Sequence, residues 1–253
     1  MNGLFAQLAE LAGVAEASVW HAALVFLRVG AMVSLLPALG EQALPQRVKL
    51  AAAVALTLIV APAVTVPAGY GVLALAGEAA VGLCLGFGLR LLVMGLQTAG
   101  TLAAQSVSLA QMFAGTGPEP APIVANLLTL CGVALFVLAG GLARSAELLI
   151  LSYQMLPAGQ PPDPAALADW GLSRVAQVFA LAFALAAPFV LAALLYNLAL
   201  GVINRAMPAL MVSFVGAPAL TLGGLILLAL ATPVLLHVWQ GAMERALTAP
   251  FAG

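Results

Sequence analysis

Long apolar stretches with almost no charge are the feature that most constrains this chain. Candidate helices lie near residues 17–39, 48–67, 72–96, 123–156, 172–203 and 209–240, and several reach the roughly 20 residues that a helix needs to cross a hydrocarbon core. Charged residues make up 7% of the chain, against about a quarter in soluble domains. The sequence therefore predicts an all-α integral membrane protein of about six long apolar helices, some of them kinked or broken.

Proline and glycine mark the ends of these helices. Residues 39–49 separate the first two helices, 61–71 the next two, and 156–171 form the longest polar connection, which we expect at the level of water or lipid headgroups. No segment remains for a soluble domain, so a single unit is predicted. Glu10 and Glu16 precede the first apolar run, which argues against a cleaved signal peptide; we expect this run to stay in the mature protein.

The distribution of basic residues does not define one orientation of all helices in the membrane. Arg47 and Lys49 predict that the connection 39–49 is cytoplasmic, whereas the connections 112–122 and 157–170 contain no lysine or arginine. A simple alternation of six crossings does not satisfy both observations. We therefore expect that some segments do not cross as ordinary lipid-facing helices.

Ionisable side chains inside apolar helices need a partner or a cavity. Those in or at the edges of the candidate helices are Arg28, Glu78, Arg90, Arg144, Glu147 and Arg205. Arg144 and Glu147 are three residues apart, so they share a helix face and could neutralise each other. Glu78 and Arg90 are too far apart for one face, so their partners are expected on other segments or other chains. With so few charges in the chain, partner subunits are expected to supply some of these partners.

One helix carries a mostly polar stripe. Its residues recur at steps of three or four and are Arg90, Met94, Gln97, Thr101, Gln105, Ser108 and Met112, which places them on one helix face. The stripe either forms hydrogen bonds with another helix or lines a water-filled passage. Gly82 and Gly86 on the same segment form a small-xxx-small step, which favours close helix packing.

The sequence offers no recognisable catalytic constellation. His21 and His237 lie at opposite ends, Asp163 and Asp169 both fall in the polar connection, and the two cysteines are far apart. Nucleotide-binding, metal-binding and serine-hydrolase motifs are absent from the sequence, and no basic run could bind nucleic acid. We predict a non-enzymatic protein without cofactor, metal or nucleic-acid partner.

Three stretches are distinctive, EQALPQRVKLAAAVALTLIVAP (41–62), GEAAVGLCLGFGLRLLVMGLQTAGTLAAQSVSLAQMF (77–113) and NLALGVINRAMPALMVSFVGAPALTLGG (197–224). They resemble three segments of the FliR family of flagellar export proteins. The last is the most specific, with Asn197, Gly201, Asn204, Arg205 and Pro208 at the relative positions usual in the family. The resemblance covers nearly the whole chain.

The resemblance implies a core subunit of the flagellar type III export gate in the bacterial inner membrane, at the flagellar basal body. The expected partners are FliP, FliQ and FlhB, with FlhA nearby, together with unfolded export substrates and membrane lipid. The implied fold joins a FliP-like portion, about residues 1–170, to a FliQ-like portion, 171–253, packed as hairpins in a helical assembly. Buried-charge or subunit-contact roles fall on Arg28, Arg47, Glu78, Arg144, Glu147, Asn197, Asn204, Arg205 and Pro208.

The resemblance also implies a plug that closes the export channel, at about residues 106–119. Its candidate residues are Ser106, Ser108, Gln111, Met112, Phe113, Gly115 and Gly117. A flexible methionine beside an aromatic ring suits a deformable apolar seal. The chain departs from the family pattern at Gln105-Ser106-Val107, at Gly117-Pro118-Glu119 and at Ala209.

Two alternatives stay open at the level of sequence. The first is the homologous subunit of a virulence injectisome, the SctT family, which these residues do not separate from the flagellar subunit. The second is a stand-alone secondary transporter, whose hallmark would be broken helices at matched positions of two halves.

Overall fold

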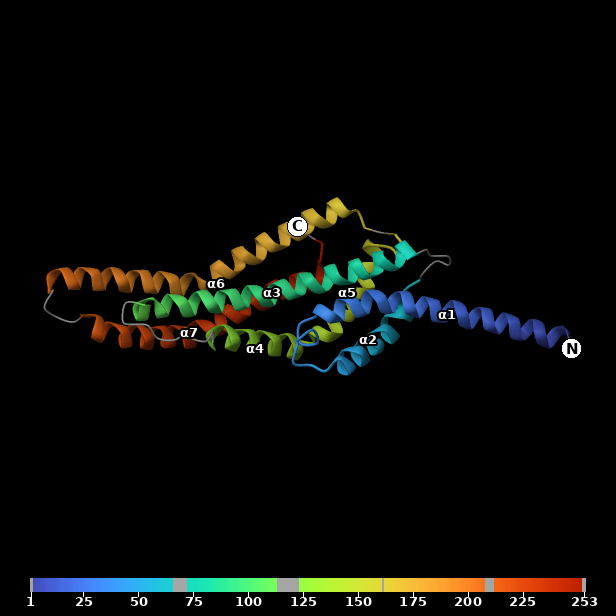
Figure 1. Ribbon diagram of the computed structural model, residues 1–253, viewed down its shortest axis with the longest axis horizontal. Coiled ribbons are helices and arrows are strands. Elements are labelled where there is room, and N and C mark those ends of the chain that lie inside the picture. Colours follow the sequence, from blue (N-terminus) through green and yellow to red (C-terminus); the bar gives the residue numbers. More distant parts are fainter. Residues whose placement is uncertain (1, 66–71, 113–122, 161, 208–211, 252–253) are drawn as a thin grey trace. The chain divides into compact units, whose positions relative to one another are not determined.

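Seven α-helices and one short 3-10 helix make up the part of the chain that the computed structural model describes, residues 2–65, 72–112, 123–160, 162–207 and 212–251 (Figure 1). They are α1 (Asn2–Leu35), α2 (Gln46–Val60), η1 (Ala61–Ala63), α3 (Val72–Met112), α4 (Ile123–Leu138), α5 (Gly141–Met155), α6 (Pro164–Ala206) and α7 (Val212–Thr248). Five helices are long and apolar enough to cross a membrane, or six spans if the bent pair α4–α5 counts as one. The predicted all-α membrane fold is confirmed.

Proline, glycine and one aspartate set the helix boundaries. Helix α1 ends at Leu35, two residues before Pro37, whose ring disfavours a helical residue before it. Helix α6 begins with Pro164 in the first helical position, where the missing N–H is not needed. The Asp163 carboxylate accepts a hydrogen bond from the Ala165 N–H at 3.1 Å, an N-cap that satisfies one of the free donors at the helix start.

The helices differ from the predicted ranges in several places. Helix α1 starts at Asn2 rather than near 17, α2 ends at Val60 rather than near 67, and α3 runs on to Met112 rather than ending near 96. Helix α7 runs on to Thr248, and residues 164–171 of the predicted polar connection are helical, with an N-cap at Asp163. The predicted helix 123–156 is broken after Leu138, where Gly140 takes a φ of +75°. A left-handed glycine is a common helix terminator because it lacks the Cβ that would clash.

The chain forms two compact units that are interleaved along the sequence. Unit 1 contains Met1–Arg90, Phe136–Ser173 and Arg245–Gly253, and unit 2 contains Leu91–Leu135 and Arg174–Glu244. The division into a FliP-like portion, 1–170, and a FliQ-like portion, 171–253, concerns likeness to other subunits and stays a prediction.

In unit 1, α1 packs against α2 and makes a very close contact with α3. A Cβ atom on Gly82 would lie 2.1 Å from the Arg28 carbonyl oxygen, and one on Gly86 would lie 2.7 Å from the Met32 carbonyl oxygen. Only glycine lets two backbones approach this closely, which maximises van der Waals contact where no hydrophobic effect drives association. The predicted small-xxx-small contact is confirmed.

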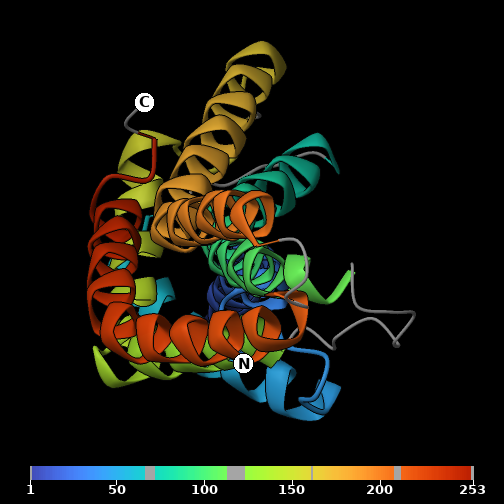
Figure 2. The ribbon, with the colours of Figure 1, turned by 90° about the vertical axis from the view of Figure 1, so that its left-hand side faces the viewer.

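Unit 2 combines the second part of α3 with most of α4, α6 and α7. A Cβ on Gly100 of α3 would lie 2.5 Å from the Ala125 Cα of α4, a second close helix contact. Trp239 of α7 is completely buried, and its indole N–H donates to the Leu92 carbonyl of α3 at 2.8 Å. Helices α6 and α7 run antiparallel (Figures 1 and 2), and the Tyr196 hydroxyl donates to the Gly216 carbonyl at 2.5 Å.

The Gly82 contact predicts an asymmetric response to alanine. Gly82→Ala should lower the free energy of unfolding by roughly 1–3 kcal/mol, because the added methyl group meets backbone that cannot rotate away. Gly171→Ala is the matched control, since a Cβ there has no neighbour within 4 Å; it should leave stability unchanged or raise it by up to about 1 kcal/mol. Melting temperatures of the full chain in detergent measure both, and equal values would contradict the close contact.

Candidate functional site

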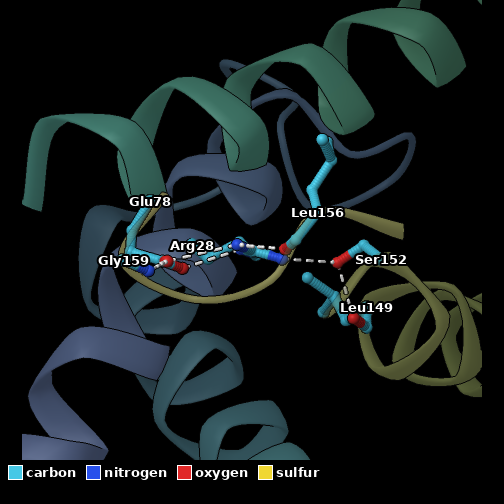
Figure 3. Close-up of polar contacts among 6 residues, drawn as sticks. All are labelled: Arg28, Glu78, Leu149, Ser152, Leu156 and Gly159. Carbon is cyan, nitrogen blue, oxygen red and sulfur yellow. Dashed lines mark hydrogen bonds and ion pairs between the residues drawn. The ribbon is translucent and has the colours of Figure 1, made fainter. Parts of the chain in front are cut away.

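The most strongly held charges of the chain form a buried ion pair in unit 1. Arg28 of α1 and Glu78 of α3 are joined by Nε–Oε2 and Nη2–Oε1 hydrogen bonds of 2.7 and 3.2 Å (Figure 3). Their side chains are 1% and 2% exposed. Two parallel bonds between a guanidinium and a carboxylate are the strongest geometry available to such a pair. Each charge is therefore neutralised inside the chain.

The rest of the Arg28 guanidinium faces the end of α5. Nη1 donates to the Ser152 hydroxyl at 3.1 Å, and that hydroxyl donates to the Leu149 carbonyl at 2.6 Å. Nη2 also donates to the Leu156 carbonyl at 3.1 Å, one of the carbonyls that a helix leaves unpaired at its C-terminus. The Tyr153 ring lies 3.7 Å from the guanidinium carbon, within the range of a cation–π contact. Arg28 thus caps α5 from another helix.

Glu78 holds the chain that follows α5. Its Oε1 accepts a hydrogen bond from the Gly159 N–H at 3.1 Å, where Gly159 has a φ of +79°. Figure 3 shows the carboxylate between this amide and the guanidinium. The ion pair therefore fixes α1, α3, the end of α5 and the start of the connection to α6 at one point. We call these residues, Arg28, Glu78, Ser152, Leu156 and Gly159, the charge centre.

The glycine contact explains why these two charges meet. Glu78 precedes Gly82 by four residues, so both lie on one face of α3, and Gly82 touches the backbone of Arg28 itself. The partner of Glu78 was expected on another segment or on another chain, and it lies on another segment, α1. A neighbouring chain is therefore not required as the partner of either charge of this pair. Sequence reasoning missed Ser152 and Gly159, because neither residue type signals a charge partner by itself.

A second ion pair joins Arg90 of α3 to Glu41, which lies between α1 and α2. Here the side chains are 30% and 34% exposed, so solvent weakens the interaction. The partner of Arg90 lies on another segment, as predicted, although the sequence did not single out Glu41. Its signal was its position as the acidic residue of the connection 39–49.

The predicted stripe follows one continuous helix, α3. Met94, Gln97 and Gln105 are exposed, and Arg90 and Thr101 are half-buried. The Thr101 hydroxyl donates to the Gln97 carbonyl of its own helix at 3.0 Å. Within the described residues, no side-chain hydrogen bond involves the Gln97 or Gln105 amide. Within the described side chains of the stripe, the two glutamines therefore keep hydrogen-bonding capacity for other partners.

The predicted plug lies mostly beyond the described residues. Ser106 is buried, and its hydroxyl donates to the Leu102 carbonyl at 2.7 Å. The backbone of Ser108, Gln111 and Met112 forms the last turns of α3. Phe113, Gly115 and Gly117 are outside the part of the chain that the structure describes, so the plug stays a prediction.

The remaining predicted residues do not belong to the charge centre, and most of them are exposed. Asn197, Asn204 and Arg205 are exposed on the last turns of α6, Glu147 is exposed and Arg144 half-buried on α5, and Arg47 is exposed on α2. Pro208 lies outside the described residues. The pairing of Arg144 with Glu147 stays a prediction.

The fold and its buried ion pair define an all-α membrane protein held together by glycine contacts and internal charge neutralisation. Comparison with known proteins makes this class specific. The chain matches the model of a family described as bacterial export proteins, family 1, over residues 19–246. This chain therefore belongs to the FliR family of bacterial export proteins.

Individual relatives match the sequence of this chain over most of their length. The chain is 37% identical over 233 residues to the flagellar biosynthetic protein FliR of Caulobacter vibrioides, covering 87% of this chain and 92% of that protein. It is 32% identical to FliR of Pectobacterium carotovorum and 30% identical to FliR of Escherichia coli, each covering 83% of both chains.

The charge centre predicts strong non-additivity between its two charges. Glu78→Gln or Arg28→Met alone should destabilise the chain by about 3–5 kcal/mol. The first leaves the buried Arg28 guanidinium without a counter-charge, and the second leaves the buried Glu78 carboxylate without one. The double variant Arg28→Met/Glu78→Gln should be less destabilised than either single variant, since no charge remains buried. Thermal unfolding of the detergent-solubilised full chain measures the cycle, and additive losses would contradict the assignment.

Glu41→Gln is the matched control for this cycle. It removes the same type of interaction from the half-exposed pair with Arg90. The expected loss is below about 1 kcal/mol.

Proposed function

We propose that this chain is a core, non-enzymatic subunit of the flagellar type III export gate in the bacterial inner membrane, at the flagellar basal body. The observation that carries the proposal is the match to flagellar FliR proteins over nearly the full length of both chains. The names of these relatives favour a flagellar gate over an injectisome. Membership in an export gate implies FliP-, FliQ- and FlhB-type partners, with FlhA nearby, and unfolded protein as cargo.

Helix length supports an assembly with other membrane subunits. The apolar part predicted for α6, residues 172–203, and the apolar span of α3, with 33 residues, are about 48 and 50 Å long at 1.5 Å per residue. A bilayer core is only about 30 Å thick. A tilt of up to about 40° removes only part of this excess. The surplus apolar surface is best covered by protein, and FliP- and FliQ-type chains are the proposed cover.

The end of α6 has the character of a subunit contact. Asn197, Gly201, Asn204 and Arg205 are all exposed, and a Cβ on Gly201 would have no neighbour within 4 Å. Exposed amides without a side-chain hydrogen bond to the described residues, beside a glycine whose Cβ position has open space, suit close packing against another helix. We assign this end, up to Pro208, to contact with a neighbouring gate subunit. Arg144 and Glu147, the latter exposed, are assigned to such contacts as well.

The stripe on α3 supports the proposed channel and plug. The amides of Gln97 and Gln105 are exposed and form no side-chain hydrogen bond with the described residues, and α3 leads from them to the glycine- and proline-containing residues 113–122. Non-helical backbone at membrane depth is tolerated where protein or water surrounds it. We propose that residues 106–119 enter the lumen of the assembly and close it, with Met112 and Phe113 as sealing side chains.

The gate assignment predicts a defined composition. Extraction of the native assembly should give a complex that contains one copy of this chain with several FliP- and FliQ-type chains, measured as the mass of the intact detergent-solubilised particle. Transport of a small solute by the purified chain alone would instead favour a secondary transporter.

The plug predicts a leak without loss of assembly. Removal of residues 110–118 should raise the conductance of membranes containing the gate to ions and small solutes, because the seal is gone. The mass of the intact complex should stay the same. Unchanged conductance in a fully assembled complex would contradict the plug.

The hydrogen bonding of the stripe predicts that substitution of its glutamines reduces export more than substitution of Thr101. Gln97→Leu and Gln105→Leu should reduce export of flagellar proteins, measured as secreted substrate. Thr101→Val is the control and should have little effect, because its hydroxyl already bonds within α3. Loss of export with the complex intact indicates a lumen-lining face, whereas loss of the complex itself indicates a contact between subunits.

A further inference from the structure

The end of the chain is buried, although chain ends are poorly ordered in most proteins unless they are tied down. Helix α7 ends at Thr248, and Ala246 and Leu247 of its last turn are 8% and 5% exposed. Pro250 behind the helix is also buried, and a proline at this place stops the helix from running on. Residues 245–251 belong to unit 1. The end of the chain is therefore docked rather than loose.

The first turns of α6 show the opposite combination, since they are helical but exposed. Val178 is the first buried residue of α6, and no residue from Pro164 to Ser173 is buried. Gly171 lies in this stretch, where a Cβ atom would have no neighbour within 4 Å. Glycine inside a helix lowers its stability relative to alanine. Few buried contacts mean a low local stability, so individual side-chain contacts decide whether these turns stay docked.

Trp170 joins the first turns of α6 to the end of the chain. Its indole N–H donates a hydrogen bond to the Pro250 carbonyl at 2.9 Å. Its ring centroid lies 5.7 Å from that of Phe251, within the range of a favourable aromatic pair. The indole also packs on α3, because a Cβ atom on Gly88 would lie 3.4 Å from its Cη2 and Cζ2 atoms. All four residues belong to unit 1, so Trp170 connects three of its segments.

We infer that Trp170, Pro250 and Phe251 form a latch, which holds the first turns of α6 on α3 and opens without unfolding the rest of unit 1. A neutral hydrogen bond and an aromatic contact each contribute less than a bidentate buried ion pair. The charge centre holds the connection before α6 at Gly159, which limits the opening on that side. On the other side, Gly171 directly follows Trp170 and gives α6 a weak point at which the opening can end.

The latch also sets an order of events during folding. Trp170 and Pro250 are 80 residues apart, and α7 ends two residues before Pro250. The hydrogen bond between them can therefore form only after all of α7 has been made. The latch concerns contacts within unit 1 and does not depend on the export-gate assignment, so its failure would leave that assignment intact.

The test measures hydrogen–deuterium exchange of the detergent-solubilised full chain at the backbone amides of residues 168–173. Trp170→Phe keeps a ring on α3 but removes the N–H donor, and it should speed this exchange about fivefold. Phe251→Ala removes the aromatic contact and should also speed the exchange about fivefold. A chain that ends at Ala249 loses both contacts, and its exchange should be about 25-fold faster.

Two substitutions serve as matched controls. Trp20→Phe makes the same change at a tryptophan of α1 that is 46% exposed, and it should leave the exchange at residues 168–173 unchanged. Gly171→Ala should slow this exchange about fivefold, because alanine stabilises the helix and its methyl group meets no neighbour. In wild type, the amides of residues 152–156 beside the charge centre should exchange about tenfold more slowly than those of residues 168–173, because the latch opens without breaking the ion pair.

Unchanged exchange at residues 168–173 in the chain that ends at Ala249 would overturn the latch, because the first turns of α6 would then be held without the end of the chain. Equal exchange rates at residues 168–173 and 152–156 in wild type would also overturn it, since unit 1 would then open as a whole. Phe251→Ala alone decides the question if Trp170→Phe lowers the helix content of the chain, because Phe251 lies after the last helix.

Discussion

An arginine that cannot reach water must find all its partners inside the protein, and unit 1 is organised around this requirement. Four of the N–H groups of Arg28 are used, on Glu78, Ser152 and Leu156. The partners come from α3, from α5 and from the chain after α5, so the ion pair acts as a junction of segments. In an apolar surrounding, the loss of any one partner is expensive, which couples the positions of these segments.

The junction depends in turn on a missing side chain. Gly82 allows the α3 backbone to reach the Arg28 carbonyl, and this sets the register that brings Glu78 beside the guanidinium. Glycine supplies the closeness and the ion pair supplies the specificity. Neither alone would choose one register, because a small-residue face tolerates sliding, whereas a bidentate pair does not.

The sequence was sufficient to predict where the helices lie along the chain, but not which residues pair between them. Apolar length and proline positions predicted about six spans, some of them kinked or broken, and the break near Gly140 is one such interruption, although its position was not predicted. The close contact at Gly82 and Gly86 was also predicted from spacing. Arg28 and Glu78 were both recognised as buried charges, yet 50 residues separate them and nothing local links them. The start of α6 was misjudged because the cap at Asp163 outweighed the polar composition of 164–171.

The polar groups of the two units differ in where their partners lie. In unit 1 the buried charges are satisfied internally, so nothing outside the chain is required to hold them. In unit 2 the amides of Gln97 and Gln105 are exposed, as is Asn197, and lipid would penalise each of them. The charge centre therefore needs no partner from outside unit 1, whereas the exposed amides of unit 2 would gain from polar surroundings other than lipid.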